Sequence, residues 1–231
     1  MSSIVDEEFG TITLRRSARA THVRVRVAPD GRLRASLPLY APLFLVKRLI
    51  KSSRPQLRAM LEEQHPKTRY EPGMQIGKSH TLVVRASSRS QPRIARHGQQ
   101  IIAELPSGMT LDTPALQREL RDAVIGALRV EAKSYLPKRL GYLAAQHGYV
   151  YEKVRFSHAG SRWGSCSSTG TISLNIALMK LPFELIDYVI IHELSHTRHL
   201  NHSSDFWTEV AVGDPAYRLH RDQLKKESPS I

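Results

Sequence analysis

The segment His192-Glu193-Leu194-Ser195-His196 combines two imidazoles and a carboxylate at a spacing that could support chemistry. Residues four apart share one face of an α-helix, so both histidines can reach a single metal ion. Glu193 lies beside them, where it can act on a water molecule held by that ion. This arrangement is typical of a zinc site that hydrolyses its substrate.

A third protein ligand must come from outside this helical turn. His202 lies six residues after His196, and Asn201 tolerates the left-handed backbone conformation that would let the chain leave the helix and double back. We therefore expect His202 to complete the site. Glu209 is the alternative, as the nearest downstream carboxylate for a class with a glutamate ligand. His199 is expected at the helix end, either interacting with the helix C-terminus or orienting a ligand or the substrate.

The sequence predicts that the helix leading into this segment is buried. Pro182 can begin the helix, and its middle, Tyr188–Ile191, is apolar on every side. Ahead of it, Val150–Ser157 and Thr171–Asn175 read as strands that flank a turn rich in serine and glycine. The strand around Ile172–Leu174 is a candidate sheet edge along which an extended peptide could pair, or simply part of the core.

A longer helix is expected upstream. Thr113-Pro114 supplies an N-cap and a first-turn proline, and apolar residues recur at helical spacing as far as Leu128. Pro137 should end or kink this helix, because proline lacks the N–H donor and its ring clashes with the preceding turn. A further helical stretch, Arg139–Gln146, should stop at Gly148.

The first third of the chain has mostly strand-like patterns. Val23–Val27 alternates with arginine, and Asp30-Gly31 predicts a hairpin turn into Leu33–Leu37. Short helices are expected over 43–50 and 57–61, and strands over 81–85 and 100–105. The sequence therefore predicts an α+β protein, with a β-rich N-terminal part over 1–105 and a domain that carries the metal site over 106–231.

Composition excludes several classes of protein. One cysteine in 231 residues, Cys166, rules out a disulfide framework, and no apolar stretch approaches the ~20 residues of a membrane span. The first residues carry Asp6, Glu7 and Glu8 and do not resemble a secretory signal, so we expect a cytoplasmic protein. The net charge of +13 favours polyanionic partners such as nucleic acid or nucleotides, although it also suits a solvated basic surface.

The motifs near the metal segment resemble those of a known family. In chain order they are Arg162-Trp163-Gly164-Ser165-Cys166, Ile172-Ser173-Leu174-Asn175, His192-Glu193-Leu194-Ser195-His196, Asn201-His202-Ser203 and Phe206-Trp207. Over residues 155–210 they are similar to the YgjP-like metallopeptidase family, relatives of the SprT-like zincins. The resemblance implies a small zincin-like domain in which His192, His196 and His202 bind Zn²⁺ and Glu193 is the catalytic base.

The function that these observations favour is zinc-dependent hydrolysis of peptides, in which Glu193 activates a zinc-bound water. Arg162, Trp163 and His199 are candidates for substrate binding, because a cation and an aromatic in a turn bounded by glycine suit a carbonyl, carboxylate or phosphate. A stacked structural Arg-Trp pair is the alternative for Arg162 and Trp163.

Two other functions remain open from the sequence. The same site could hydrolyse phosphoanhydrides as a pyrophosphatase-type nucleotide phosphohydrolase, which the positive charge would favour. Alternatively, the chain is a non-enzymatic, basic nucleic-acid-binding module with a structural zinc. A structural zinc usually has four protein ligands and needs no neighbouring glutamate, which argues against this second alternative.

Overall fold

The computed structural model describes residues 2–28, 32–63 and 69–231, a mixed α and β fold with a β-rich N-terminal part. They form two compact units, Met1–Arg69 and Tyr70–Ile231. The expected boundary after residue 105 falls inside the second unit, because the strands over residues 75–106 share a core with the helix that follows them. Within the described ranges, no helix is both long and apolar enough to cross a bilayer.

The first unit is a four-stranded sheet with two helices. The strands are ordered β1-β2-β4-β3, with β2 and β4 parallel and the other pairs antiparallel. Apolar residues that alternate along the strands pack against Val46, Ile50 and Leu57 of the helices and form a separate core. The elements are β1 (Ser2–Asp6), β2 (Gly10–Arg16), β3 (Arg24–Val27), β4 (Leu33–Leu37), α1 (Leu43–Ser52) and α2 (Arg54–Glu63).

The expected strand pair and helices of this unit are confirmed. β3 and β4 pair antiparallel, with Val27 opposite Leu33. The predicted turn residues Asp30 and Gly31 lie outside the described residues. α1 covers the helix predicted over 43–50, and α2 covers the helix predicted over 57–61. Pro42 precedes α1, and only Ser53 separates the two helices.

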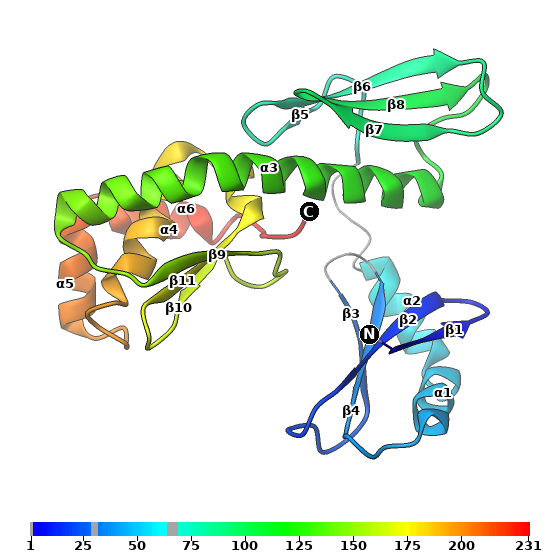
Figure 1. Cartoon of the computed structure of the whole chain (residues 1–231), viewed down its shortest axis with the longest axis horizontal. Helices are drawn as coiled ribbons and strands as arrows, with labels where there is room; N and C mark the ends of the chain where they lie inside the picture. Colours follow the sequence, from blue (N-terminus) through cyan, green and yellow to red (C-terminus); the bar gives the residue numbers. More distant parts are fainter. Residues whose placement is uncertain (1, 29–31, 64–68) are drawn as a thin grey trace. The chain divides into compact units, whose positions relative to one another are not determined.

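The second unit is built around one long helix, α3 (Pro114–His147). In Figure 1 a four-stranded sheet lies along one side of α3, and the remaining helices and a smaller sheet lie along the other. Leu120, Leu128, Leu136 and Leu140 of α3 are fully buried between them. The larger sheet has the order β5-β6-β8-β7 and consists of β5 (Gln75–Ile76), β6 (His80–Ser87), β7 (Arg93–His97) and β8 (Gln100–Pro106).

Pro137 was expected to end or kink the long helix, but it does not divide the segment into two helices. α3 continues through this proline to His147. A proline inside a helix loses one backbone hydrogen bond and costs roughly 3 kcal/mol. Leu136 and Leu140 on either side of Pro137 are fully buried, so the packing of the helix outweighs this local cost. The helix ends as predicted at Gly148, which adopts the left-handed conformation with φ 67°.

The smaller sheet precedes the buried helix in the chain. Its order is β10-β11-β9, with β9 and β11 parallel and β10 antiparallel to β11. Of the two roles left open for Ile172–Leu174, the sheet edge is wrong and the core is confirmed, because β11 pairs on both sides, its Ile172 and Leu174 are fully buried, and β10 is the edge strand. The remaining elements are β9 (Lys153–Ser157), β10 (Gly164–Cys166), β11 (Thr171–Asn175), a 3₁₀ helix η1 (Ile176–Lys180), α4 (Phe183–Ser195), α5 (Ser204–Gly213) and α6 (Tyr217–Leu224).

A buried carboxylate fastens the larger sheet to α3. Glu131, 6% exposed, accepts hydrogen bonds from the backbone N–H groups of Lys78 (2.7 Å), Ser79 (2.9 Å) and His80 (3.2 Å). The Ser79 hydroxyl (2.9 Å) and His80 Nδ1 (2.6 Å) complete the set. Gly77 is required here, because a Cβ atom would lie 2.2 Å from Glu131 Oε2 and φ is +61°.

Replacing Glu131 by glutamine is expected to lower the free energy of unfolding by about 2 to 3 kcal/mol at pH 7, because the amide cannot accept all of these hydrogen bonds. Burial works to raise the pKa of Glu131, but the bonds from His80, Lys78 and Ser79 outweigh it and leave the pKa below 4.5. This contribution is therefore present above that pH and lost in acid.

Urea denaturation between pH 3 and pH 8 checks this expectation. The stability difference between wild type and Glu131→Gln should shrink as the pH falls. Glu119→Gln, on an exposed position of the same helix, is the control and should match the wild type. If the wild type and Glu131→Gln had the same free energy of unfolding at pH 7, this would contradict the role given to the carboxylate.

Candidate metal centre

Three imidazoles converge at the end of α4. His192 lies in α4, His196 immediately follows it, and His202 lies in the loop before α5. One ligand atom from each lies within 4.8 Å of the other two, and the Nε2 atoms of His192 and His202 are 3.2 Å apart. Two nitrogens that bind one tetrahedral zinc ion at about 2.0–2.1 Å lie roughly 3.4 Å from each other. The observed spacing therefore fits the edge of such a coordination shell.

Backbone and aromatic contacts fix the orientation of these rings. His196 Nδ1 lies 3.0 Å from the carbonyl oxygen of His199, which leaves Nε2 of His196 available to an ion. Phe206 of α5 is fully buried and stacks on the His196 ring at 4.5 Å. Trp207 stacks on His202 at 5.7 Å. The start of α5 therefore packs directly against the loop histidine.

The histidines are electrically suited to bind a metal. Burial lowers the pKa of His192 to about 3, with further lowering by the charges of His196, His202 and Arg221. The pKa of His202 is also lowered, again by burial first and then by His196 and Arg221. Both rings are therefore neutral around pH 7, the form in which imidazole donates a lone pair to a metal.

Glu193 lies beside the histidines in an almost closed environment. Its side chain is 5% exposed, and Oε2 has no hydrogen-bond partner among the described residues. Burial raises the pKa of Glu193 to about 8, and the positive charge of Arg162 lowers it in part. An unpartnered buried carboxylate is costly for stability, so its presence here favours a function.

The edge strand β10 leaves just enough room for this carboxylate. A Cβ atom on Gly164 would lie 2.6 Å from Glu193 Oε1 and 2.7 Å from its Cγ. Contacts this short do not occur between a real Cβ and a fixed neighbour, and Glu193 is held by the burial of α4. Glycine is therefore the residue that allows β10 to run past the carboxylate.

Asn175 positions the loop ahead of β10, a role that the sequence did not reveal. Its side-chain amide donates to the carbonyl oxygens of Ala159 (2.7 Å) and Arg162 (2.9 Å), and its Oδ1 accepts from Ala177 N–H (3.0 Å). Its own N–H donates to the carbonyl oxygen of Trp163 at 2.8 Å. Asn175 is fully buried. Its place at the end of the predicted strand Thr171–Asn175, within the motif Ile172-Ser173-Leu174-Asn175, does not indicate these partners.

Glu209, the alternative third ligand, has another partner. Its carboxylate accepts a hydrogen bond from the guanidinium of Arg198, which also donates to the carbonyl oxygen of Gly148 at 2.6 Å. The same guanidinium lies 4.4 Å from the centre of the Tyr149 ring. Glu209 thus fastens α5 to the end of α3, and the geometry brings His202 to the other histidines instead.

A cavity of about 310 Å³ opens at the histidines and the edge strand. It is lined by Gly164, Ser165, Cys166, His192, Glu193, His196, Leu200 and His202. Arg162, Trp163 and His199 lie outside this lining. Arg162 acts on Glu193 through its charge, Trp163 packs against the core, and His199 contributes the carbonyl that orients His196. Direct substrate contact by these three residues stays a prediction.

The model of the YgjP-like, metallopeptidase domain family matches residues 21–227. The chain belongs to the YgjP-like metallopeptidase family. The match reaches well beyond residues 155–210, where the motifs lie, and includes most of both compact units. Membership of the family implies a metal ion, and the histidine cluster is a site that could hold one.

Among solved structures, the chain is similar to the crystal structure of the metallopeptidase zymogen of Pyrococcus abyssi abylysin. The two sequences are 30% identical, the match covers 39% of this chain and 92% of that chain, and the TM-score is 0.36. No curated protein matches the sequence.

The two candidates for the third ligand predict different metal contents. His202→Ala is expected to weaken zinc binding by more than the 10- to 100-fold typical of losing an outer-shell partner. Glu209→Gln should keep the metal, because Glu209 is bonded to Arg198 and not directed to the histidines. Elemental analysis and zinc titration of both variants beside the wild type provide the measurement. Loss of zinc from Glu209→Gln with retention in His202→Ala would reverse the assignment.

Proposed function

We propose that this member of the YgjP-like metallopeptidase family is a zinc-dependent peptidase in which His192, His196 and His202 bind the metal and Glu193 is the general base. The observation that carries the proposal is the convergence of three imidazoles beside a buried, unpartnered carboxylate in one open cavity. Three protein ligands leave a coordination position free, as catalytic zinc sites require. This domain would then be zincin-like, with α4 as its active-site helix.

Each residue has a distinct task in this proposal. His192, His196 and His202 would hold the zinc ion, which would supply a Lewis acid for the scissile carbonyl and lower the pKa of water towards about 7. Glu193 accepts the proton of the attacking water and delivers it to the leaving amine. Arg162 favours the ionised form of Glu193 that can accept this proton. Phe206 and Trp207 hold the imidazoles at fixed positions.

The edge strand offers a place for an extended peptide. In the β10–β11 ladder, Asn175 N–H donates to Trp163 and Ser167 N–H donates to Thr171, so the hydrogen-bonded positions of this region are 163, 165 and 167. The backbone groups of Gly164 and Cys166 therefore point away from β11, to the open edge. Both residues line the cavity. We propose that the substrate adds a strand to β10 and so places its peptide bond beside Glu193.

The cavity favours a peptide over a nucleotide. Its eight lining residues include no lysine or arginine, and Arg162 and Arg221 act on the site from outside this lining. Phosphate-binding sites generally supply such cations or several backbone N–H groups. A phosphohydrolase activity is therefore the second candidate, to be tested on the same samples.

Glu193→Gln is the direct test of the general base. The variant should keep its zinc and lose about 10²- to 10⁴-fold in kcat, the usual contribution of general acid–base catalysis. Cleavage of an unfolded, fluorescently labelled protein is measured together with metal content and release of phosphate from nucleoside triphosphates. Glu184→Gln, an exposed position on the same helix, is the control. Retained peptidase activity would remove Glu193 from the mechanism, and phosphate release alone would exchange the two candidate functions.

Gly164→Ala tests the close passage of β10 and the carboxylate. The new Cβ must displace Glu193, so we expect a fall of about 10- to 100-fold in kcat with zinc retained. Gly126→Ala is a matched control, because Gly126 lies in α3 with nothing within 4 Å of its added Cβ. Equal activity of the two variants would show that β10 does not constrain Glu193.

A further inference from the structure

Four arginines of the first unit share the face of the sheet that points away from its core. Side chains alternate along a strand, and Leu14, Val27, Leu33 and Ala35 face the core. The exposed arginines at the intervening positions therefore face outward; they are Arg15 on β2, Arg24 and Arg26 on β3, and Arg34 on β4. We refer to these four residues as the arginine face.

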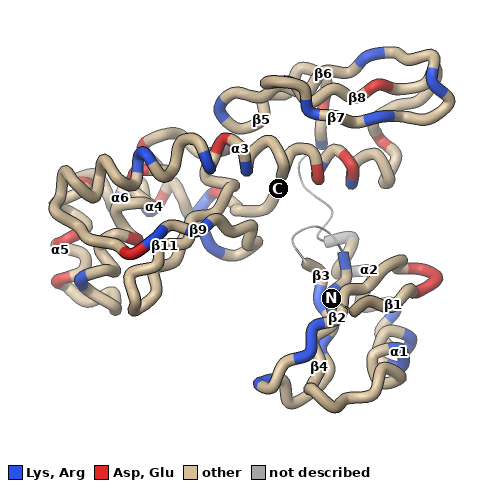
Figure 2. The backbone as a smooth tube through the Cα atoms, viewed as in Figure 1, with Lys and Arg blue, Asp and Glu red and all other residues tan. Residues whose placement is uncertain are grey.

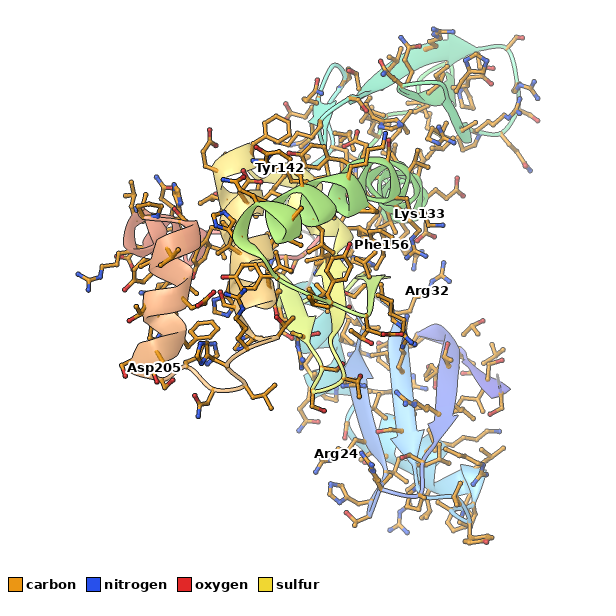
Figure 3. All side chains as sticks on the ribbon, turned by 60° about the vertical axis from the view of Figure 1, so that its left-hand side comes forward. Arg24, Arg32, Lys133, Tyr142, Phe156 and Asp205 are labelled. Carbon is orange, nitrogen blue, oxygen red and sulfur yellow. The ribbon has the colours of Figure 1, made fainter. Side chains whose placement is uncertain are left out.

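The strand register places these arginines close together. Arg26 lies directly opposite Arg34, while Arg24 and Arg15 lie on either side of Ser36. Because β3, β4 and β2 are neighbours spaced about 4.8 Å apart, the whole group spans roughly 10 Å across the strands. Figure 3 labels Arg24 at one end of the β3–β4 pair and Arg32 at the other end, where it precedes β4.

Two acidic groups of the unit, Asp6 and Glu8, pair with arginines of α2. Asp6 and Glu8 bind Arg54 at 3.2 and 2.8 Å, and Glu8 also binds Arg58. Figure 2 shows negative charge at the turn between β1 and β2 and positive charge along β3 and β4. Among the described strand residues that point outward with the arginines, none is acidic.

Positive charge is concentrated in this unit. Arg26 and Arg34 occupy directly opposite positions on neighbouring strands, where like charges repel. Residues 1–69 contain 14 lysines and arginines against 6 aspartates and glutamates, a balance of +8 out of +13 for the chain. A concentration of arginine on one face is the electrostatic footprint of a surface that binds phosphates.

We propose that the arginine face binds the phosphate backbone of single-stranded nucleic acid. The guanidinium group matches phosphate with two parallel hydrogen bonds, and the hydroxyls of Thr13 and Ser36 lie between the arginines as further donors. A four-stranded sheet is too broad for the major groove of a duplex, which admits a helix or a two-stranded ribbon. A single strand can lie across the sheet instead.

The contacts predict binding that depends on salt and not on sequence. Each phosphate neutralised on a single strand contributes about 0.7 to the slope of log K against log salt concentration. Membrane surfaces, by contrast, are bound by faces that also insert apolar side chains. The positions between the arginines carry hydroxyls rather than apolar groups, which favours nucleic acid as the occupant.

Fluorescence anisotropy with a labelled oligothymidylate of about 20 nucleotides tests the proposal on the full chain. The combined variant Arg24→Ala, Arg26→Ala and Arg34→Ala should raise Kd about tenfold or more and reduce the salt slope by about 2. The control is Arg93→Ala, Arg118→Ala and Arg129→Ala, which removes the same charge from exposed positions of the second unit. This control should bind nearly as the wild type does.

A second variant keeps the test independent of folding. Arg24→Gln with Arg26→Gln removes two exposed charges of β3 and leaves the core side chains of this strand in place, so its melting temperature should not fall while its binding weakens. The proposal is overturned if the wild type does not bind the oligonucleotide or if both triple variants weaken binding equally. Tighter binding of polyglutamate or of vesicles containing phosphatidylserine than of the oligonucleotide also overturns it.

Discussion

Helix α4 must satisfy two demands at once: its apolar residues need burial on every side, and the polar groups at its end need access to a cavity. Leu185, Ile186, Val189 and Ile190 are buried against the rest of the second unit, which fixes the helix in position and in rotation. Rotation is the decisive variable, because a helix that turns by one residue moves its side chains by about 100°. The core therefore determines which side chains reach the cavity, before any ligand contributes.

The long helix α3 supplies the opposite wall of that core. The helix packs against both sheets of the unit, and the bidentate pair between Arg139 and Asp187, with both N–O distances 2.7 Å, links it to α4 at the surface. Glu131 fastens the larger sheet to the same helix. The site thus depends on interactions well outside its cavity, and this explains how a carboxylate as unfavourably placed as Glu193 can be held there.

The sequence predicted the parts of this site that depend on local spacing. The i and i+4 histidines, the buried helix before them and the helix end at Gly148 all follow from periodicity and glycine chemistry. Features that depend on distant partners were missed or misjudged. The residues near Pro137 do not indicate that its helix is buried deeply enough to continue. The residues near Asn175 do not indicate its three carbonyl partners, which lie in the preceding loop. The edge strand was misplaced for the same reason, because β10 has only three residues and its position depends on β11.

Net charge is the clearest case of a property that sequence reports without a location. A balance of +13 on the whole chain would suit a nucleotide substrate if the charge lined the cavity. The lining residues of the cavity carry no lysine or arginine, and most of the excess charge belongs to the first 69 residues. Most of the excess charge therefore belongs to the first unit, whereas the metal site belongs to the second. Net charge alone therefore does not identify the substrate of the metal site, because electrostatic attraction depends on where the charges lie and not on the chain average.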